Sequence, residues 1–188
     1  MRFAATALER LAIVLASLAL SAGLIAVLSG FFAGRDQAGI SGGANGPGQA
    51  FPDQGHAVLA AGQAPPRYDS DPPTSGPHVP ELVLHDETKL NDNQLLQALQ
   101  LGNVVIEYAT SAPRAGLRAF ARSVLDAPFS PALAAAGQAV ILAPGASGAR
   151  QTPITALAWA HLLRVGSPSD PKLREFVEFW LGRGAPGR

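Results

Sequence analysis

The stretch LLQALQLGNVVIEY, residues 95–108, decides the fold because it contains the end of a helix and the strand that follows it. Asn91 is placed to cap this helix and Gly102 is placed to end it. The apolar residues of the helix share one face, formed by Leu95, Ala98 and Leu99. The β-branched and aromatic residues of 103–108 predict a strand.

A second helix and a second strand follow along the chain. Residues 112–126 predict a helix because apolar residues recur at i, i+3, i+4, i+7 and i+8, which gives a buried stripe of Leu117, Phe120, Ala121, Val124 and Leu125. The run QAVILAP, residues 138–144, is short and apolar, which is consistent with a buried central strand. Because a helix connects the two strands, we expect them to be parallel with a right-handed crossover.

The last part of the chain predicts one more strand and a terminal helix. Residues 154–163, ITALAWAHLL, alternate in a way that favours a strand, with one side formed by Thr155, Leu157, Trp159 and His161. Residues 169–182 predict a helix capped by Asp170. The expected fold is a small mixed-sheet α/β sandwich over residues 56–183, in the order helix, strand, helix, strand, strand, helix, with a C-terminal tail at 184–188.

An apolar segment precedes this domain. Residues 11–33 contain no charged side chain and are long enough to cross a bilayer as a helix. Arg2 and Arg10 lie before it, so the positive-inside rule places residues 1–10 in the cytoplasm and the domain on the periplasmic or extracellular side of the inner membrane. A signal peptide cleaved near ALSAG, residues 19–23, is the competing interpretation, and the length of the apolar segment favours the uncleaved anchor.

Composition marks a linker and excludes several function classes. Residues 34–55 are rich in glycine and have almost no large apolar side chain, which predicts a flexible linker.

The 14 Lys and Arg residues equal the 14 Asp and Glu residues in number, and a net charge of zero argues against a nucleic-acid partner. The chain has no cysteine, which excludes disulfides, thiolate metal sites and cysteine nucleophiles.

The segment YDSDPPTSGPH, residues 68–78, here called the proline arm, cannot form an ordinary helix or a central strand. Pro72 and Pro73 fix an extended polyproline conformation. Such a stiff segment can hold one side chain in a defined place, or it can cover a hydrophobic surface. Ser75 lies near His78 but lacks the G-x-S-x-G motif of a nucleophile, so a serine in a turn is the favoured interpretation.

The proline arm resembles a segment of a bacterial family, domain of unknown function 3105. The resemblance covers residues 56–186 and also rests on LLQALQLGNVVIEY, VILAP, ALAWAHLLRV and LREFVEFWLGRGAP. It implies a single-pass membrane protein with one small extracytoplasmic domain. The family helix reads H-x-L-E-H-G, which implies a metal or acid–base cluster with the histidine of the arm. Here Gln97, Gln100 and Leu101 stand at those polar positions, so the chain resembles a degenerate member.

The candidate binding residues lie in the proline arm and in the helix that departs from the family pattern. They are Tyr68, Asp71, Ser75, His78, Gln97 and Gln100. His56 and His78, with His85 nearby, form the alternative hypothesis of a zinc or copper site. A third set, Arg114, Arg118 and Arg122, forms a basic stripe that is interpreted as a solvated helix face rather than an anion site.

Two functions remain after these exclusions. The first is a membrane-tethered, non-catalytic binding or scaffold module with a protein or small-ligand partner, favoured because no catalytic constellation is recognisable. The alternative is a metal-binding domain that uses the histidines. The sequence predicts no catalytic residue and no cofactor other than that metal.

Overall fold

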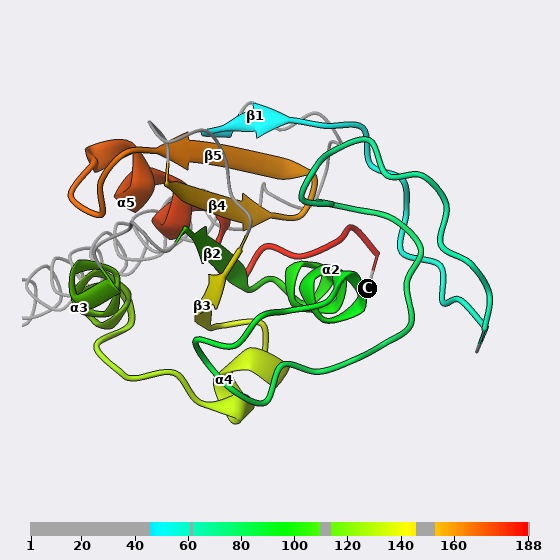
Figure 1. Cartoon of the computed structure of the whole chain (residues 1–188), viewed down its shortest axis with the longest axis horizontal. Coiled ribbons are helices and arrows are strands. Elements are labelled where there is room, and N and C mark those ends of the chain that lie inside the picture. The colour runs from blue at the N-terminus through cyan, green and yellow to red at the C-terminus, as the bar shows by residue number, and fades with distance from the viewer. Residues whose placement is uncertain (1–45, 61, 110–113, 146–152, 188) are drawn as a thin grey trace, which may run out of the picture. The chain divides into compact units, whose positions relative to one another are not determined.

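The computed structural model describes residues 46–60, 62–109, 114–145 and 153–187 (Figure 1). No helix in these ranges is long and apolar enough to cross a membrane. The expected cytoplasmic N-terminus, 1–10, and the expected anchor, 11–33, lie outside the described residues.

The described residues form one mixed sheet with helices. The strands are β1 (Gln49–Ala50), β2 (Val104–Tyr108), β3 (Val140–Pro144), β4 (Ile154–Ala158) and β5 (His161–Val165), and the helices are α2 (Asp92–Leu101), α3 (Arg114–Leu125), α4 (Pro131–Ala135) and α5 (Pro171–Trp180). The strand order is β1-β5-β4-β2-β3. β2 and β3 are parallel, and the other neighbouring pairs are antiparallel. The predicted mixed α/β class is confirmed.

The junction of α2 and β2 forms as the sequence predicts. The Asn91 side chain accepts the backbone N–H of Gln94, and the Gln94 side chain accepts the backbone N–H of Asn91, which completes a capping box. Gly102 ends the helix with a φ of 105°, a left-handed conformation that glycine adopts without steric cost.

Asn103 fastens this junction to the rest of the core. Its side chain is buried, and its Nδ2 donates to the carbonyl oxygens of Ala98 at 3.0 Å and Ala134 at 2.8 Å. Its Oδ1 accepts the backbone N–H of Ala139 at 2.8 Å. One side chain therefore joins α2, α4 and the start of β3.

Helices cover both faces of the sheet (Figure 1). α3 and α5 pack on the face that carries Val104, Ile106 and Leu142. α2 and α4 pack on the opposite face, which carries Val105, Ile141 and Leu157. The long segment between β1 and α2 lies on the same side as α2 and adds apolar residues to that core, among them Phe51, Tyr68, Val83 and Leu90.

Residues 154–163 belong to a hairpin and not to the single strand that their alternation predicts. A two-residue turn connects β4 and β5, which pair in antiparallel orientation. Ala160 in this turn has a φ of 57°. Ala158 pairs with His161, and directly opposed residues point to the same face of a sheet. His161 therefore stacks on Trp180 of α5, with ring centroids 3.9 Å apart, on the face opposite to the predicted one.

Strand β3 lies at the edge of the sheet, so its interpretation as a central strand is wrong. Its side chains are buried because helices cover both of its faces. The segment before α2 covers part of the open edge. The Glu87 N–H donates to the Leu142 carbonyl oxygen at 2.8 Å, and the Asp86 Oδ1 accepts the Leu142 N–H at 2.8 Å.

Parts of the expected linker and tail pack on the domain. β1 lies within the expected linker and pairs with β5, and the Trp180 indole N–H donates to the Pro47 carbonyl oxygen at 2.9 Å. Ala185, in the expected tail, is buried and donates its N–H to the Gln100 carbonyl oxygen at 3.0 Å. The packed region is therefore longer at both ends than composition alone indicates.

Candidate binding pocket at the edge of the sheet

Two hydroxyl groups of the proline arm hold the arm in place. The Tyr68 hydroxyl donates to the Pro77 carbonyl oxygen at 3.0 Å. The Tyr68 ring lies so close to Gly76 that a Cβ there would be 2.7 Å from it. The Ser75 hydroxyl accepts the Gln54 N–H at 3.1 Å. Tyr68 and Ser75, two predicted binding residues, therefore anchor the arm to its neighbours.

The two histidines of the predicted metal site have packing roles. His78 is 1 % exposed, forms a parallel bridge with Val58, and places its Nδ1 2.9 Å from the Gly76 carbonyl oxygen. His56 lies edge-on to Trp159, with ring centroids 6.2 Å apart. Within the described ranges, no three His, Cys, Asp or Glu side chains are arranged to hold a metal ion. Metal binding at His56 and His78 stays a prediction.

The other three predicted binding residues, Asp71, Gln97 and Gln100, make separate contacts. The Asp71 carbonyl oxygen accepts a hydrogen bond from the Arg164 guanidinium at 2.9 Å. Gln97 is buried in α2, and the Gln100 carbonyl oxygen accepts the Ala185 N–H. None of the six predicted binding residues lines the pocket at the edge of β3.

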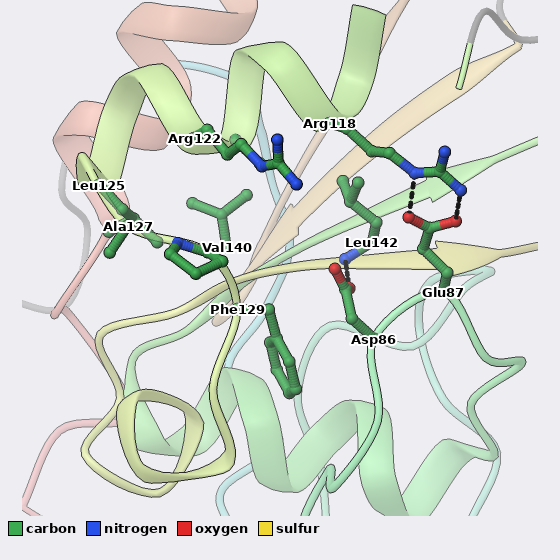
Figure 2. Close-up of a pocket in the computed structure, with 11 residues that line it drawn as sticks. Asp86, Glu87, Arg118, Arg122, Leu125, Ala127, Phe129, Val140 and Leu142 are labelled. Atoms are coloured by element: carbon green, nitrogen blue, oxygen red, sulfur yellow. Dashed lines mark hydrogen bonds and ion pairs between the residues drawn. The ribbon is translucent and has the colours of Figure 1, made fainter. Parts of the chain in front are cut away.

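That pocket, of about 350 Å³, lies between α3 and the outer edge of β3 (Figure 2). Its volume is in the range of small-ligand sites. Residues 86–87 and 127–129 border it on two sides. Most of its wall is apolar, formed by Ala121, Leu125, Ala127, Pro128, Phe129, Val140 and Leu142, and its charged residues are Asp86, Glu87, Arg118 and Arg122.

Arg118 and Glu87 border the pocket as an ion pair. Arg118 Nε donates to Glu87 Oε1, and Arg118 Nη2 donates to Glu87 Oε2, so the contact is bidentate (Figure 2). The hydrogen bonds from the guanidinium lower the pKa of the Glu87 carboxyl, and the same bonds raise the pKa of Arg118. Both groups stay ionised and engaged with each other.

Asp86 is engaged in a different way. Its carboxylate accepts the backbone N–H of Leu142, as Figure 2 shows. Burial raises the pKa of Asp86, and the hydrogen bonds from the amides of Leu142 and Glu87 oppose that rise. The side chain replaces the acceptor that a neighbouring strand would supply to this edge.

Val140 carries unpaired backbone groups at the same edge. The Val104 N–H donates to the Ala139 carbonyl oxygen, so in the parallel ladder the odd-numbered residues of β3 bond to β2 and the even-numbered residues point outward. The outward groups of Leu142 are paired as described above. Within the described residues, the N–H and C=O of Val140 have no hydrogen-bond partner, although Val140 is 1 % exposed. Such buried orphan groups are rare and costly.

Arg122 is exposed, and its guanidinium is the charged group of the pocket that makes no hydrogen bond or ion pair within the described ranges. Its guanidinium lies above Val140 and Leu142 in Figure 2. Arg114, at the start of α3, instead lies over the Tyr108 ring, 5.4 Å from the centroid. All three arginines of the basic stripe are exposed, as expected for a solvated helix face, and Arg118 and Arg122 also line the pocket.

Glu107 and Thr155 form a second polar site, at the end of β2. They lie directly opposite each other, and the Thr155 hydroxyl is fully buried without a partner. Burial raises the pKa of Glu107 to about 7, and the carboxylates of Asp71 and Asp92 add to the rise. A Cβ at Gly145 would lie 2.5 Å from Glu107 Oε2, so this space is closed. Thr155 is buried and Glu107 is half-buried, so the site is a closed polar pair rather than an open pocket.

The sequence contained signals for both sites. Glu107 is the one acidic residue of the apolar run NVVIEY, and such an isolated charge indicates a half-buried carboxyl. Arg122 follows Arg118 by one helical turn, next to the apolar stripe of α3. The unpaired backbone groups of Val140 could not be predicted from the sequence, because they depend on which strand lies at the edge of the sheet.

The chain matches a family model. A family model described as "Protein of unknown function (DUF3105)" matches residues 62–187. No curated protein and no solved structure matches the chain.

Proposed function

The chain belongs to the DUF3105 family of proteins of unknown function, and we propose that its globular domain is a non-catalytic binding module. The pocket between α3 and β3 is its ligand site, and the ligand is an apolar group that carries a carboxylate. This proposal moves the binding site away from the proline arm, where the Tyr68 and Ser75 hydroxyls hold the arm and the His78 Nε2 is buried without a partner among the described residues.

Arg122 is the observation that carries the proposal. A guanidinium without a protein partner stands over a pocket whose wall is mostly apolar. A carboxylate is the natural partner for such a group, because guanidinium and carboxylate form short, charge-assisted hydrogen bonds. The apolar wall would then take the rest of the ligand.

The chemistry of the lining supports binding rather than catalysis. The pocket is lined by no Ser, Thr, Cys, His, Tyr or Lys side chain within the described residues, so it offers none of the common nucleophiles. Its two carboxylates are engaged, Glu87 by Arg118 and Asp86 by the Leu142 amide. Neither is placed to move a proton on a ligand.

The proposed setting is the outer surface of the inner membrane. The uncharged segment 11–33 would anchor the chain, with residues 1–10 in the cytoplasm and the domain in the periplasm or outside the cell. The glycine-rich residues after the anchor would let the domain move relative to the bilayer.

A small apolar carboxylate tests the proposal. We expect para-fluorophenylacetate to bind the full chain in lipid nanodiscs, as measured by fluorine NMR titration, and the neutral para-fluorophenylacetamide to bind much more weakly. Arg122→Gln should weaken binding of the acid at least about tenfold, because a charged hydrogen bond contributes ~1.5–3 kcal/mol. Arg114→Gln, on the same helix but outside the pocket, is the matched control. Equal affinity of wild type and Arg122→Gln would disprove the proposal.

A further inference from the structure

We infer that the proline arm encloses an internal water site, in which one ordered water molecule donates hydrogen bonds to the His78 Nε2 and the Gln54 Oε1. The site is separate from the pocket between α3 and β3, because neither residue lines that pocket. It stands or falls independently of the ligand proposed for the pocket.

His78 contributes a buried lone pair. Its side chain is 1 % exposed, and its Nδ1 lies 2.9 Å from the Gly76 carbonyl oxygen. Because a carbonyl oxygen only accepts hydrogen bonds, the Nδ1 carries the ring proton, and the Nε2 of the neutral imidazole presents its lone pair. This Nε2 is buried and has no hydrogen-bond partner among the described residues. A buried acceptor without a donor is costly, and an ordered water is its usual partner where the protein supplies none.

Gln54 contributes a second buried acceptor beside the same glycine. Its Nε2 donates to the Arg67 carbonyl oxygen at 3.3 Å, which fixes the orientation of the amide. The Oε1 is the acceptor that remains, and it is buried without a partner among the described residues. A Cβ on Gly76 would lie 3.4 Å from this Oε1, and the Gly76 carbonyl oxygen accepts the His78 Nδ1–H. Gly76 therefore lies against both residues.

Backbone contacts hold the two residues in register. The Gln54 N–H donates to the Ser75 Oγ at 3.1 Å, and the His78 N–H donates to the Ala57 carbonyl oxygen at 3.1 Å. These two contacts are three residues apart in each segment, so the segments run side by side. The Tyr68 ring lies against the turn between Ser75 and His78 and shields it. The acceptors are thus held by the backbone on one side and covered on the other.

The hydrogen-bonding groups of the site favour water over a cation. Two acceptors require a ligand with two donors, which water has. The Trp159 indole packs in the same cluster as Tyr68, and its Nε1 is a buried donor without a partner in the described part of the chain. Water can also accept from such a donor, whereas an ammonium or metal cation cannot. Among the described residues, no three His, Cys, Asp or Glu side chains are arranged to hold a metal ion.

A water-selective NOE measurement on the full chain in lipid nanodiscs, with isotope-labelled histidine, tests the site. The ring Hδ2 of His78 is the reporter, because it lies beside the Nε2 and away from the exchanging Nδ1 proton. We expect a cross-peak between water and this Hδ2 with the sign of a long-lived bound molecule. His85, which is exposed, should give no such cross-peak. A His78 Hδ2 without a bound-water signal would overturn the inference.

Gln54→Met tests the second acceptor, because methionine keeps the length of the side chain and removes the amide oxygen. The bound-water cross-peak of His78 should fall several-fold in this variant. Gln63→Met is the matched control, since the Gln63 side chain is exposed and accepts the Ala60 N–H instead. A cross-peak of unchanged intensity in Gln54→Met would show that Gln54 does not hold the water, which contradicts the bridge.

The nitrogen chemical shift of the His78 Nε2 gives a second measurement that needs no variant. It should be that of an unprotonated ring nitrogen that accepts a hydrogen bond. The shift of a protonated nitrogen, or of a lone pair that meets no donor, would overturn the site even if Gln54→Met failed to fold.

Discussion

The Asp86 carboxylate accepts the backbone N–H of Leu142 at 2.8 Å, so a side chain closes one position of the outer edge of β3. Exposed strand edges are prone to pair with other chains, and proteins often cover them. The cover stops one position short, at Val140. The same edge is therefore hydrogen-bonded at Leu142 and left unpaired, although buried, at Val140.

Removal of the Asp86 carboxylate should destabilise the domain. Asp86→Ala leaves the Leu142 N–H without an acceptor, and we expect the free energy of unfolding to fall by about 1–2 kcal/mol. Asp86→Asn keeps an acceptor oxygen and should cost less. Urea unfolding of both variants measures the difference. An equal loss in both would show that the hydrogen bond to Leu142 does not contribute.

Glu107 should make stability depend on pH. Its pKa is raised from 4.5 to about 7 in the folded protein, so the folded state holds a proton that the unfolded state releases between these values. The contribution is complete below pH 4.5 and is lost as pH rises through 7. The loss is at most about 3 kcal/mol, reduced by the partial solvent access of the carboxyl.

Glu107→Gln isolates this effect, because an amide of similar shape does not ionise. We expect the wild type to lose stability relative to this variant as the pH is raised from about 4.5 to about 8. The difference between the two unfolding free energies, followed by urea titration across this range, cancels the other titrating groups. A difference that does not change with pH would contradict the raised pKa.

His78 should matter for folding and not for zinc. The side chain is 1 % exposed, so His78→Ala should lower the free energy of unfolding by roughly 2 kcal/mol or more through loss of packing. His85→Ala, at an exposed position, is the control. Equimolar zinc should leave the thermal midpoint of the wild type unchanged. A zinc-dependent rise that both His56→Ala and His78→Ala abolish would instead establish the metal site.

Asn103→Ala should be among the most destabilising single changes. It removes hydrogen bonds to Ala98, Ala134 and Ala139 at once, and these backbone groups are buried. We expect a loss of about 2–4 kcal/mol in the free energy of unfolding. Asn103→Asp keeps the acceptor for Ala139 but turns a carboxylate oxygen toward the carbonyl oxygens of Ala98 and Ala134 in a buried site, and should cost at least as much as the alanine variant. An alanine variant as stable as the wild type would show that the junction is held by packing alone.

Local signals predicted the parts of the fold that local chemistry determines. Asn91 and Gly102 marked the two ends of α2 correctly. The capping hydrogen bonds of Asn91 and the left-handed conformation of Gly102 each involve only residues a few positions away. The turn at Ala160 was missed because no glycine or asparagine marks its left-handed conformation. β1 was missed because its pairing partner, β5, is more than a hundred residues away in the sequence.

The candidate site was less predictable than the fold. The unusual composition of the proline arm suggested a binding role. In the structure, the hydroxyls of Tyr68 and Ser75 form hydrogen bonds that hold the arm in place. The pocket is built from four segments that only the packed structure brings together, namely residues 86–87, α3, residues 127–129 and β3. The lack of a partner for Arg122 is a property of this packing and has no signature in the sequence.

The most direct test of the pocket is the backbone amide of Val140. In the full chain labelled with isotope-enriched valine, titration with para-fluorophenylacetate should shift the amide NMR signal of Val140. The signal of Val105, whose side chain lies on the opposite face of the sheet, should stay in place. Arg122→Gln should abolish the shift. A Val140 signal that does not move at saturating probe would contradict a ligand site at the edge of β3.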